Sequence, residues 1–382
     1  MWNSTGLGTL GRMAIYKTAA NPYELAVADS HVTVIRPLKQ FVLPEYLYYY
    51  FANPTVQSVI EDQADGTTKQ KELATATIKA YLTPIPPLNE QRRILAKLSE
   101  VLPVVKIYRT VYDETAALQE AFPERLKKSI LQEAVQGKLV AQDPSDEPAE
   151  ALLERIRAEK QRIIKEGKIK KDKHESVIFR RDNSHYEKLD GVERCIDDEL
   201  PFEIPDSWEW VRLIDICEYI QRGKSPRYSS IKKYPVIAQK CNQWSGFSIE
   251  KAQFIEPESI TSYGKERFLQ DNDLMWNSTG LGTLGRMAVY KSALNPYELA
   301  VADSHVTVIR PMKEFISPQY LYYYFSNPTV QSVIEDQADG TTKQKELSAT
   351  TVRAYLVPLP PYNEQIRIVN QIEAVLPLVV RV

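Results

Sequence analysis

One long internal repeat dominates the sequence. Residues 1–108 align with residues 275–382 without a gap, and 80 of the 108 aligned positions carry the same residue. Most of the differences follow Lys71. The period is far longer than the roughly 20–50 residues that build a solenoid. The repeat therefore predicts a duplicated domain in a chain of 382 residues, which is long enough for two or three domains.

The two copies differ in what precedes them. Residues 200–274 lead into the second copy with strand-like pieces such as "YPVIAQK" and "FSIEKAQFI", whereas the first copy starts at Met1. We therefore interpret residues 1–88 as the C-terminal part of a first domain and residues 208–361 as a second, complete domain. Met1 then corresponds to the internal Met275, and the chain is expected to be a permuted, truncated or excised piece.

The sequence between the copies has a helical pattern over residues 89–175. Apolar residues recur at intervals of mostly three or four between Leu98 and Phe122, which predicts a helix with one apolar stripe that faces a partner. Pro103 is expected to interrupt this helix, and a second helical piece is expected to begin after Pro123.

Two shorter segments complete the predicted organisation. Residues 176–207, which are rich in charged and polar side chains, are interpreted as a linker into the second domain. Residues 362–382 repeat the beginning of the helical pattern and are interpreted as the start of a second helical spacer.

The repeat contains a glycine-rich run, "GLGTLG", at Gly6 and again at Gly280. This run fits the G-x-G-x-x-G pattern, but a dinucleotide site also requires a strand before the loop and a helix after it. The residues after the second run, "RMAVYKS", favour a strand and show no helical period. We therefore predict a β-hairpin with a flexible tip and no cofactor.

Composition narrows the class of protein. Neither an apolar run of about 20 residues nor a secretory signal is visible, so we expect no membrane contact. Cys195, Cys217 and Cys241 are too far apart for a zinc site, which predicts no metal and a cytoplasmic location. The net charge of −2 argues against a chain that coats DNA, but it is compatible with a sequence reader whose basic groups are local.

Several motifs occur together over nearly the whole chain. They are the domain entry "IPDSWEWVRLIDI", the domain exits "IPPLNEQRRIL" and "LPPYNEQIRIV", the block "LKKSILQEAVQGKLVAQDPSDEPAEALLERI" and the repeated "GTTKQKEL". With these motifs and an internal repeat, the chain resembles the specificity subunits of Type I restriction–modification systems. It departs from the family pattern because the first domain lacks its N-terminal half and the final helix stops after a few turns.

The resemblance implies a fold and a role. The fold is α+β, with two target-recognition domains of mixed sheet and short helices linked by long coiled-coil-like helices. Each domain would read one half of a split target in double-stranded DNA, and the helices would pair antiparallel to set the spacing. Methyltransferase subunits would bind this core, and a restriction subunit with nuclease and translocase activity would join them. The chain itself would perform no chemistry, and a second copy of it could complete the helical spacer.

Polar and basic side chains in the predicted loops are the candidate DNA contacts, because Arg and Lys anchor phosphates while Asn, Gln and Arg read base edges. In the second domain the candidates are Arg222, Lys224, Arg227, Tyr228, Lys240, Asn242, Gln243, Asn277, Ser278, Thr279, Arg286, His305, Thr341, Thr342 and Lys343. In the first copy they are Asn3, Ser4, Thr5, Arg12, His31, Thr67, Thr68 and Lys69.

Other interpretations remain open. The runs "YLYYYF" are expected to be core helices rather than base-stacking platforms, and the histidine of "ADSH" has no serine elbow or second carboxylate to make it catalytic. An adenine methyltransferase-like enzyme is one alternative, although "NPYE" lacks the second proline of the base-holding motif. A helical scaffold that does not read DNA is another. If the repeated halves carry the reading loops, two such domains would favour a near-palindromic target.

Overall fold

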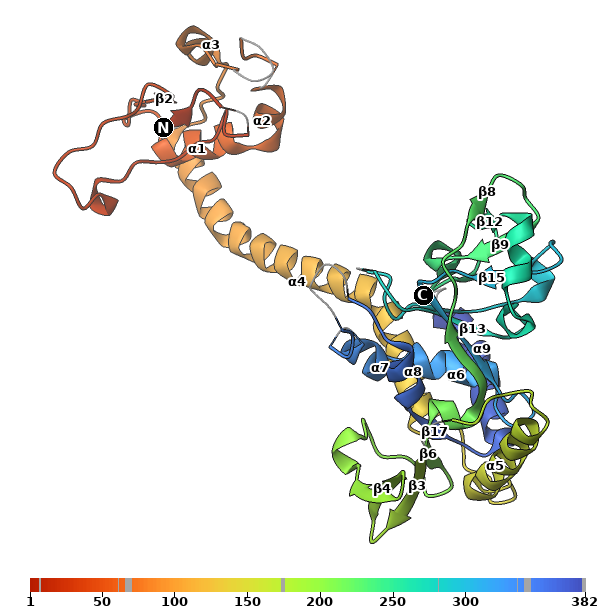
Figure 1. The fold of residues 1–382 in the computed structure, drawn as a ribbon. Helices are drawn as coiled ribbons and strands as arrows, with labels where there is room; N and C mark the ends of the chain where they lie inside the picture. Colours follow the sequence, from red (N-terminus) through yellow and green to blue (C-terminus); the bar gives the residue numbers. More distant parts are fainter. Residues whose placement is uncertain are drawn as a thin grey trace. The chain divides into compact units, whose positions relative to one another are not determined.

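The computed structural model of the protein describes residues 1–6, 8–60, 62–65, 71–172, 176–280, 282–334, 336–339 and 345–379. The chain divides into two compact units, Met1–Leu118 (unit 1) and Gln119–Val382 (unit 2), and both contain helices and strands (Figure 1). The α+β class predicted from the sequence is confirmed. Among the described residues, no helix is long and apolar enough to cross a membrane.

Unit 2 is built around a four-stranded antiparallel sheet in the order β14–β13–β16–β7. Its strands are β14 (Met287–Val289), β13 (Leu274–Asn277), β16 (Val306–Pro311) and β7 (Cys217–Arg222). Only β7 comes from the segment that precedes the repeat. The repeat therefore supplies three of the four strands. The preceding segment supplies β7, which pairs with β16 and forms one edge of the sheet.

Both faces of this sheet are covered, so β13 is buried throughout. Successive side chains of a strand point to opposite faces. Trp276 accordingly packs in a large core with Tyr320 and Ile368, whereas Met275 packs in a second core with Ile237. Helices α6 (Pro318–Phe325) and α9 (Tyr362–Val379) contribute their apolar side chains to the first core.

The segment before the repeat also supplies three strands of a second sheet, in the order β15–β9–β12–β8, and the repeat supplies β15. Its strands are β15 (Val301–Ala302), β9 (Tyr234–Ile237), β12 (Gln253–Ile255) and β8 (Tyr228–Ser229). The β15–β9 pair is parallel and the others are antiparallel. Two short pairs join β6 (Glu209–Arg212) to β17 (Leu356–Leu359) and β10 (Asn242–Gln243) to β11 (Gly246–Phe247).

Helix α6 contains the second "YLYYYF" run, and its burial confirms the prediction of a core helix. Pro318 stands at its first turn, and the Ser317 hydroxyl accepts a hydrogen bond from the Tyr320 amide. The short helices α7 (Pro328–Val333) and α8 (Ala349–Ala354) follow, with Asn327 and Ser348 as their N-caps.

The glutamine of each "NEQ" motif ties the start of one helix to another segment. The Gln365 side chain accepts from the Ser317 amide at 2.9 Å and donates to the Pro360 carbonyl at 3.0 Å. In the first copy Gln91 is bound in the same way, accepting from the Leu43 amide at 2.8 Å. Both glutamines are fully buried. The motif therefore fixes where the spacer helix leaves the domain.

The spacer segment forms α4 (Leu88–Val135) and α5 (Ala149–Lys165). The expectation that a second helical piece begins after Pro123 is wrong, since α4 is one helix through both Pro103 and Pro123. A proline removes a single N–H donor, and the hydrogen bonds of the flanking turns are enough to continue the helix. The last turns of α4 and one face of α5 pack in the core of unit 2.

The segment expected to be a linker contains a three-stranded antiparallel sheet of β3 (Ser176–Arg181), β4 (Ser184–Leu189) and β5 (Val192–Cys195). Its turns are made by Asp182–Asn183 and by Asp190–Gly191, all with positive φ. Two such residues in sequence give the turn whose twist matches that of a hairpin. Apolar and charged residues alternate along these strands, so one face of the small sheet is half-buried.

A buried ion cluster attaches this small sheet to the rest of unit 2. The Glu187 carboxylate is 2% exposed and accepts two hydrogen bonds from Arg212 of β6, at 2.9 and 2.8 Å. Ser176 and Arg194 donate to the same carboxylate. Burial alone would raise the pKa of Glu187, but these hydrogen bonds outweigh it and lower the pKa to about 2.

Unit 1 repeats the helical half of this architecture around a smaller core of Trp2, Phe51, Ile60, Leu73 and Ile78. Its elements are β1 (Trp2–Asn3), β2 (Val32–Thr33), α1 (Pro44–Ala52), α2 (Pro54–Ile60), α3 (Thr75–Ala80) and the first part of α4. Along that part of α4, apolar side chains are exposed at positions that include Val104, Tyr108 and Tyr112.

Candidate nucleic-acid interface

The glycine-rich run of the second copy connects β13 to β14, and the predicted hairpin is confirmed by their antiparallel pairing. Gly280, Gly282 and Gly285 all have positive φ, which other residues rarely adopt. A Cβ on Gly285 would also lie 2.7 Å from Cδ1 of Ile334. A strand follows the run rather than a helix, so its glycines serve a tight loop and not a pyrophosphate site.

Three predicted contacts lie beneath this loop instead of on its surface. Asn242, Asn277 and Ser278 are fully buried. The Asn242 amide donates to the Asn277 side-chain oxygen at 2.9 Å, and the Ser278 hydroxyl lies 2.5 Å from the Thr307 hydroxyl. Because these three side chains are buried inside the protein, the prediction of direct DNA contact is corrected for them, and they support the loop.

Thr279 and His305 form the first exposed edge of the interface. Thr279 Oγ1 lies 2.8 Å from His305 Nδ1, and the His305 ring is open to solvent. The buried Asp303 carboxylate accepts from the His305 amide at 2.9 Å and from the Tyr228 hydroxyl at 3.1 Å. Burial, followed by the charge of Asp303, raises the pKa of Tyr228. These contacts fix an imidazole and a phenol on neighbouring segments.

The β10–β11 hairpin forms a second edge. Gln243 accepts from the Arg286 guanidinium at 2.8 Å, which joins the hairpin to the glycine loop. Lys240 is exposed just before β10, and Trp244 at the hairpin tip is 44% exposed. Gln239 donates to the carbonyl of Thr279, so a third segment is attached to the same loop.

The loop after β7 forms the third edge. Arg222 donates to the Ser304 carbonyl at 2.8 Å and pairs with Glu346. Lys224 donates to the Ser262 hydroxyl at 3.0 Å, and Arg227 is exposed. Arg222 would therefore have to leave the Glu346 carboxylate before it could bind a phosphate, whereas Arg227 forms no ion pair with the described residues.

The structure brings most of the predicted residues of unit 2 together. Hydrogen bonds connect the glycine loop, the β10–β11 hairpin, the turn at residues 303–305 and the loop after β7. Thr341, Thr342 and Lys343 lie outside the described residues, and so do Thr67, Thr68 and Lys69 of the first copy. Glu346 was not predicted, because nothing in the sequence pairs it with Arg222, which lies 124 residues away.

The first copy presents only part of this arrangement. Ser4 is buried and lies 2.5 Å from the Thr33 hydroxyl, as its counterpart does in unit 2, so it too supports the loop. Asn3 and Thr5 are partly exposed, and Arg12 is exposed. His31 differs from its counterpart, since its Nδ1 lies 2.6 Å from the Asp29 carboxylate. Hydrogen bonds from His31 lower the pKa of Asp29.

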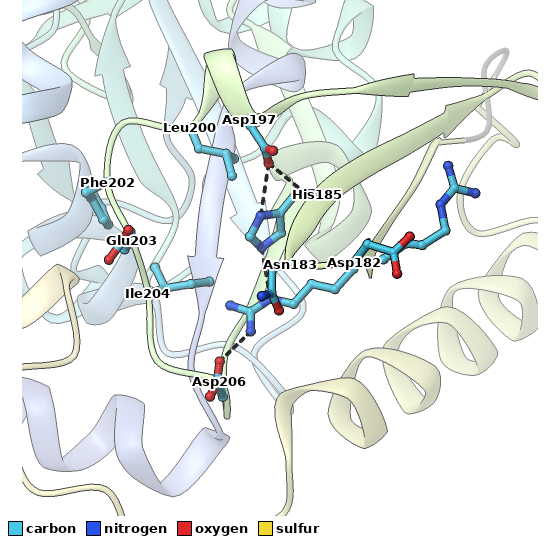
Figure 2. A pocket seen from close by; sticks show the side chains of 11 residues that line it. Asp182, Asn183, His185, Asp197, Leu200, Phe202, Glu203, Ile204 and Asp206 are labelled. Atoms are coloured by element: carbon cyan, nitrogen blue, oxygen red, sulfur yellow. Dashed lines mark hydrogen bonds and ion pairs between the residues drawn. The ribbon is translucent and has the colours of Figure 1, made fainter.

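A separate pocket of about 760 Å³ lies beside the small sheet, between β3, β4 and the chain that leads to β6 (Figure 2). Arg180 donates to Asp206 at 2.8 Å and to His185 at 3.0 Å, and His185 also faces Asp197. Burial, with the charge of Arg180, lowers the pKa of His185. Because Asp206 already binds Arg180 and no predicted contact lines the pocket, it is a poor site for a polyanion.

The edges of the interface supply positive charge and hydrogen-bonding groups, which are the two requirements of sequence-specific DNA binding. The sheet beneath it is buried on both faces, and loops carry its exposed side chains. Among the described residues, no group of three or more His, Cys, Asp or Glu is placed to hold a metal ion.

Known proteins are similar to this chain in sequence. The family model described as Type I restriction modification DNA specificity domain matches residues 1–114 and 205–377, which is more than half of the chain. The specificity subunit of the Type I restriction enzyme EcoAI from Escherichia coli is 27% identical over 95% of this chain and 64% of its own length. That of EcoEI, from the same species, is 25% identical over 91% of this chain and 62% of its own length.

A solved structure is also similar. The HsdS subunit from Thermoanaerobacter tengcongensis is 18% identical, with a TM-score of 0.43, over 91% of this chain and 66% of that chain. The chain spans less than two thirds of the length of the curated relatives it matches here.

Proposed function

The chain belongs to the family of Type I restriction–modification DNA specificity domains, and on this basis we propose that it recognises a DNA sequence for partner subunits. The observation that carries the proposal is the convergence of loops from separate segments on one part of unit 2, with hydrogen bonds joining them. Unit 2 would read one half of a bipartite target in double-stranded DNA.

The exposed residues suggest a division of roles. Arg227 and Lys240 are exposed cations and would anchor phosphates. Gln243, Thr279 and His305 offer hydrogen-bond donors and acceptors and would meet base edges. The threonines and lysine of residues 341–343 remain proposed contacts from sequence alone.

Two halves with nearly the same sequence would read nearly the same bases. The predicted contacts in the repeat are identical between the copies, from Asn3 and Asn277 to His31 and His305. If these residues carry the reading, the two half-sites would be near-identical and the complete target near-palindromic. Contacts from residues 208–274 instead would give unrelated half-sites, which methylome sequencing distinguishes.

The proposed partners are methyltransferase subunits and a restriction subunit, because the relatives are specificity subunits of Type I restriction enzymes. We infer that the chain itself is not an enzyme and that it works in the cytoplasm. The exposed apolar side chains of α4, which include Val104, Tyr108 and Tyr112, would pair with a helix of a partner or of a second copy.

Selection from a random duplex library by the full chain, alone and with its methyltransferase subunit, tests this function. Enrichment of one motif with strongly salt-dependent binding is expected. Arg227→Ala and Lys240→Ala should each weaken binding to all sequences and lower the salt slope by about 1, whereas Gln243→Ala should relax the motif. Lys188→Ala, on the small sheet, is the matched control and should change nothing.

Two outcomes would replace the proposal. Retention of all duplexes alike, with no salt dependence, would favour a scaffold that works only through its helices. Methyl transfer to adenine by the isolated chain would favour an enzyme.

A further inference from the structure

Trp244 differs from the other tryptophans of the chain in its exposure. The side chain of Trp244 is 44% exposed, whereas the other four tryptophans are fully buried: Trp2, Trp208, Trp210 and Trp276. Tryptophan is enriched where its large ring becomes buried against a bound partner. Exposure alone does not identify that partner, but the position of Trp244 in the fold does.

The β10–β11 hairpin presents Trp244 at its tip. Gln243 pairs with Gly246, so Trp244 and Ser245 are the two residues that connect the strands. Gly246 has a φ of 115°, a conformation that L side chains rarely adopt, and a Cβ placed on it would meet nothing within 4 Å. The glycine therefore serves the turn, and the space beside the tip is open.

The other aromatic ring of the hairpin is already used. Phe247 packs on Tyr290, with ring centroids 5.2 Å apart, at the second core of the sheet. Among the residues that the structure describes, no aromatic ring or cation packs on Trp244. The hairpin thus has one ring that fixes it to the sheet and one ring that is left for a ligand.

Hydrogen bonds hold the base of the hairpin against the candidate DNA-binding loops. Gln243 accepts from Arg286 of the glycine loop at 2.8 Å and donates to the Lys240 carbonyl at 2.9 Å. Asn242 donates to the Asn277 side-chain oxygen at 2.9 Å. Lys240 is exposed and Arg286 is partly exposed, so residues next to the tip carry positive charge. An anchored ring beside two cations suits a polyanion with flat apolar faces, which is nucleic acid.

Double-stranded DNA offers a tryptophan ring few flat surfaces, because each base is covered by its neighbours in the stack. A ring reaches a base face only where two neighbouring base pairs separate, and apolar side chains that enter such a step act as wedges that kink the duplex. Stacking of the ring on the opened base offsets part of the cost of separation. That cost depends on the sequence of the step, since some steps open more easily than others.

We propose that Trp244 enters one base step of the bound duplex as a wedge and stacks on a base. This inference rests on the proposed recognition of DNA. It adds a residue that senses how easily a step opens, whereas Gln243 and His305 would meet the edges of the bases.

Quenching of tryptophan fluorescence by acrylamide follows this residue directly, because the other four indoles are buried. The difference in quenching between the unchanged chain and the Trp244→Phe chain isolates Trp244, also in the presence of the methyltransferase subunit. A duplex with the selected motif should remove most of that difference, and the methyltransferase subunit without DNA should leave it in place.

Affinity for the selected motif gives the second readout. Trp244→Ala should weaken binding on the order of tenfold, as for the loss of one base–aromatic stack, and leave the salt slope unchanged because no phosphate contact is lost. Trp244→Phe keeps a ring and should lose less. Leu294→Ala is the matched control and should leave binding intact, because Leu294 is 53% exposed and follows β14, whereas the glycine loop precedes that strand.

Duplexes that each carry one abasic position across the motif test the wedge itself. The unchanged chain should bind one of them more tightly, because its step is already open, and Trp244→Ala should lose this gain. The inference is overturned if Trp244 stays quenchable in the complex, if Trp244→Ala binds the motif as well as the unchanged chain does, or if no abasic position strengthens binding.

Two further results separate this inference from its premise. Protection of Trp244 by the methyltransferase subunit without DNA would overturn the inference, by making a protein the occupant. A chain that selects no motif would overturn the proposed function itself, whereas a selected motif that Trp244→Ala binds with unchanged affinity would overturn only the role of Trp244.

Discussion

Trp2 and Trp276 occupy equivalent positions in the two copies of the repeat and pack against equivalent rings. The Trp–Phe centroids are 4.7 Å apart in both copies, at Phe51 and Phe325. The sheets around these tryptophans nevertheless differ, since β1 has two residues where β13 has four. The same sequence therefore gives the same helical packing with or without the preceding segment, but it gives the full sheet only where that segment is present.

The reason lies in where each element finds its hydrogen bonds. A helix satisfies most of its backbone groups internally, whereas a strand depends on neighbours that are distant in sequence. The Gln91 and Gln365 contacts are local to the repeat and are kept in both copies. Arg310 needs Asp273, which lies before the repeat, and its counterpart Arg36 is therefore left exposed.

The largest contrast is expected at this arginine. Arg310→Ala leaves the buried Asp273 carboxylate without its partner and should lower the free energy of unfolding of unit 2 by about 3–5 kcal/mol. Arg36→Ala removes an exposed side chain and should change unit 1 by less than about 0.5 kcal/mol. Urea unfolding of both variants gives the two values. Equal losses of unfolding free energy in the two units would contradict the difference between Arg310 and Arg36.

A smaller contrast is expected at an apolar pair. Leu356→Ala empties a buried site and should cost unit 2 about 2–4 kcal/mol, whereas Leu82→Ala should cost unit 1 almost nothing. The same urea unfolding measurement on the two variants tests this, and a large loss of stability from Leu82→Ala would contradict it.

Acid should affect the two units differently, because only unit 2 has the Glu187–Arg212 cluster. The folded-state pKa of Glu187, about 2, lies below its unfolded value of 4.5, so its contribution is present above pH 4.5 and is lost as pH falls toward 2. The shift corresponds to roughly 2–3 kcal/mol. Glu187→Gln should flatten this part of the pH–stability curve of unit 2 and leave that of unit 1 unchanged. An unaltered acid limb in the variant would contradict the assignment.

The smallest difference concerns a helix cap. Ser348 caps α8 by accepting from the Thr351 amide, whereas Ala74 at the same position before α3 makes no side-chain cap. Ala74→Ser should stabilise unit 1 by about 1 kcal/mol, and Ser348→Ala should destabilise unit 2 by a similar amount. Thermal unfolding measures both, and a destabilised Ala74→Ser variant would mean that the two N-termini are not equivalent.

Short sequence patterns were enough to predict some elements of this structure. The glycine-rich hairpin and the "YLYYYF" core helices followed from turn residues and apolar spacing. The sheet formed by β3, β4 and β5 was missed, although Asp190–Gly191 is a hairpin signal, because charged residues on half-exposed strands resemble a linker. The continuity of α4 through Pro123 could not be read from a residue that usually ends helices.

At the candidate site, prediction from sequence failed mainly because it could not separate buried polar side chains from exposed ones. Asn242, Asn277 and Ser278 have the hydrogen-bonding groups of DNA contacts, yet they are buried under the loop. The type of a residue shows whether its side chain can donate or accept a hydrogen bond. It does not show whether that side chain faces the protein interior or a DNA ligand. Asp303 and Glu346 illustrate this, since their partners Tyr228 and Arg222 are far away in sequence.

Hydrogen exchange of the free full chain measures the contrast between the copies most directly. Peptides over residues 32–38 and 306–312 differ only at Leu38 and Met312, so mass distinguishes them. Strong protection of 306–312 with rapid exchange of 32–38 is expected, because β16 is paired on both sides and the first copy is not. Equal protection of the two peptides would contradict the conclusion that the strand at residues 306–311 depends on its pairing with β7, which precedes the repeat.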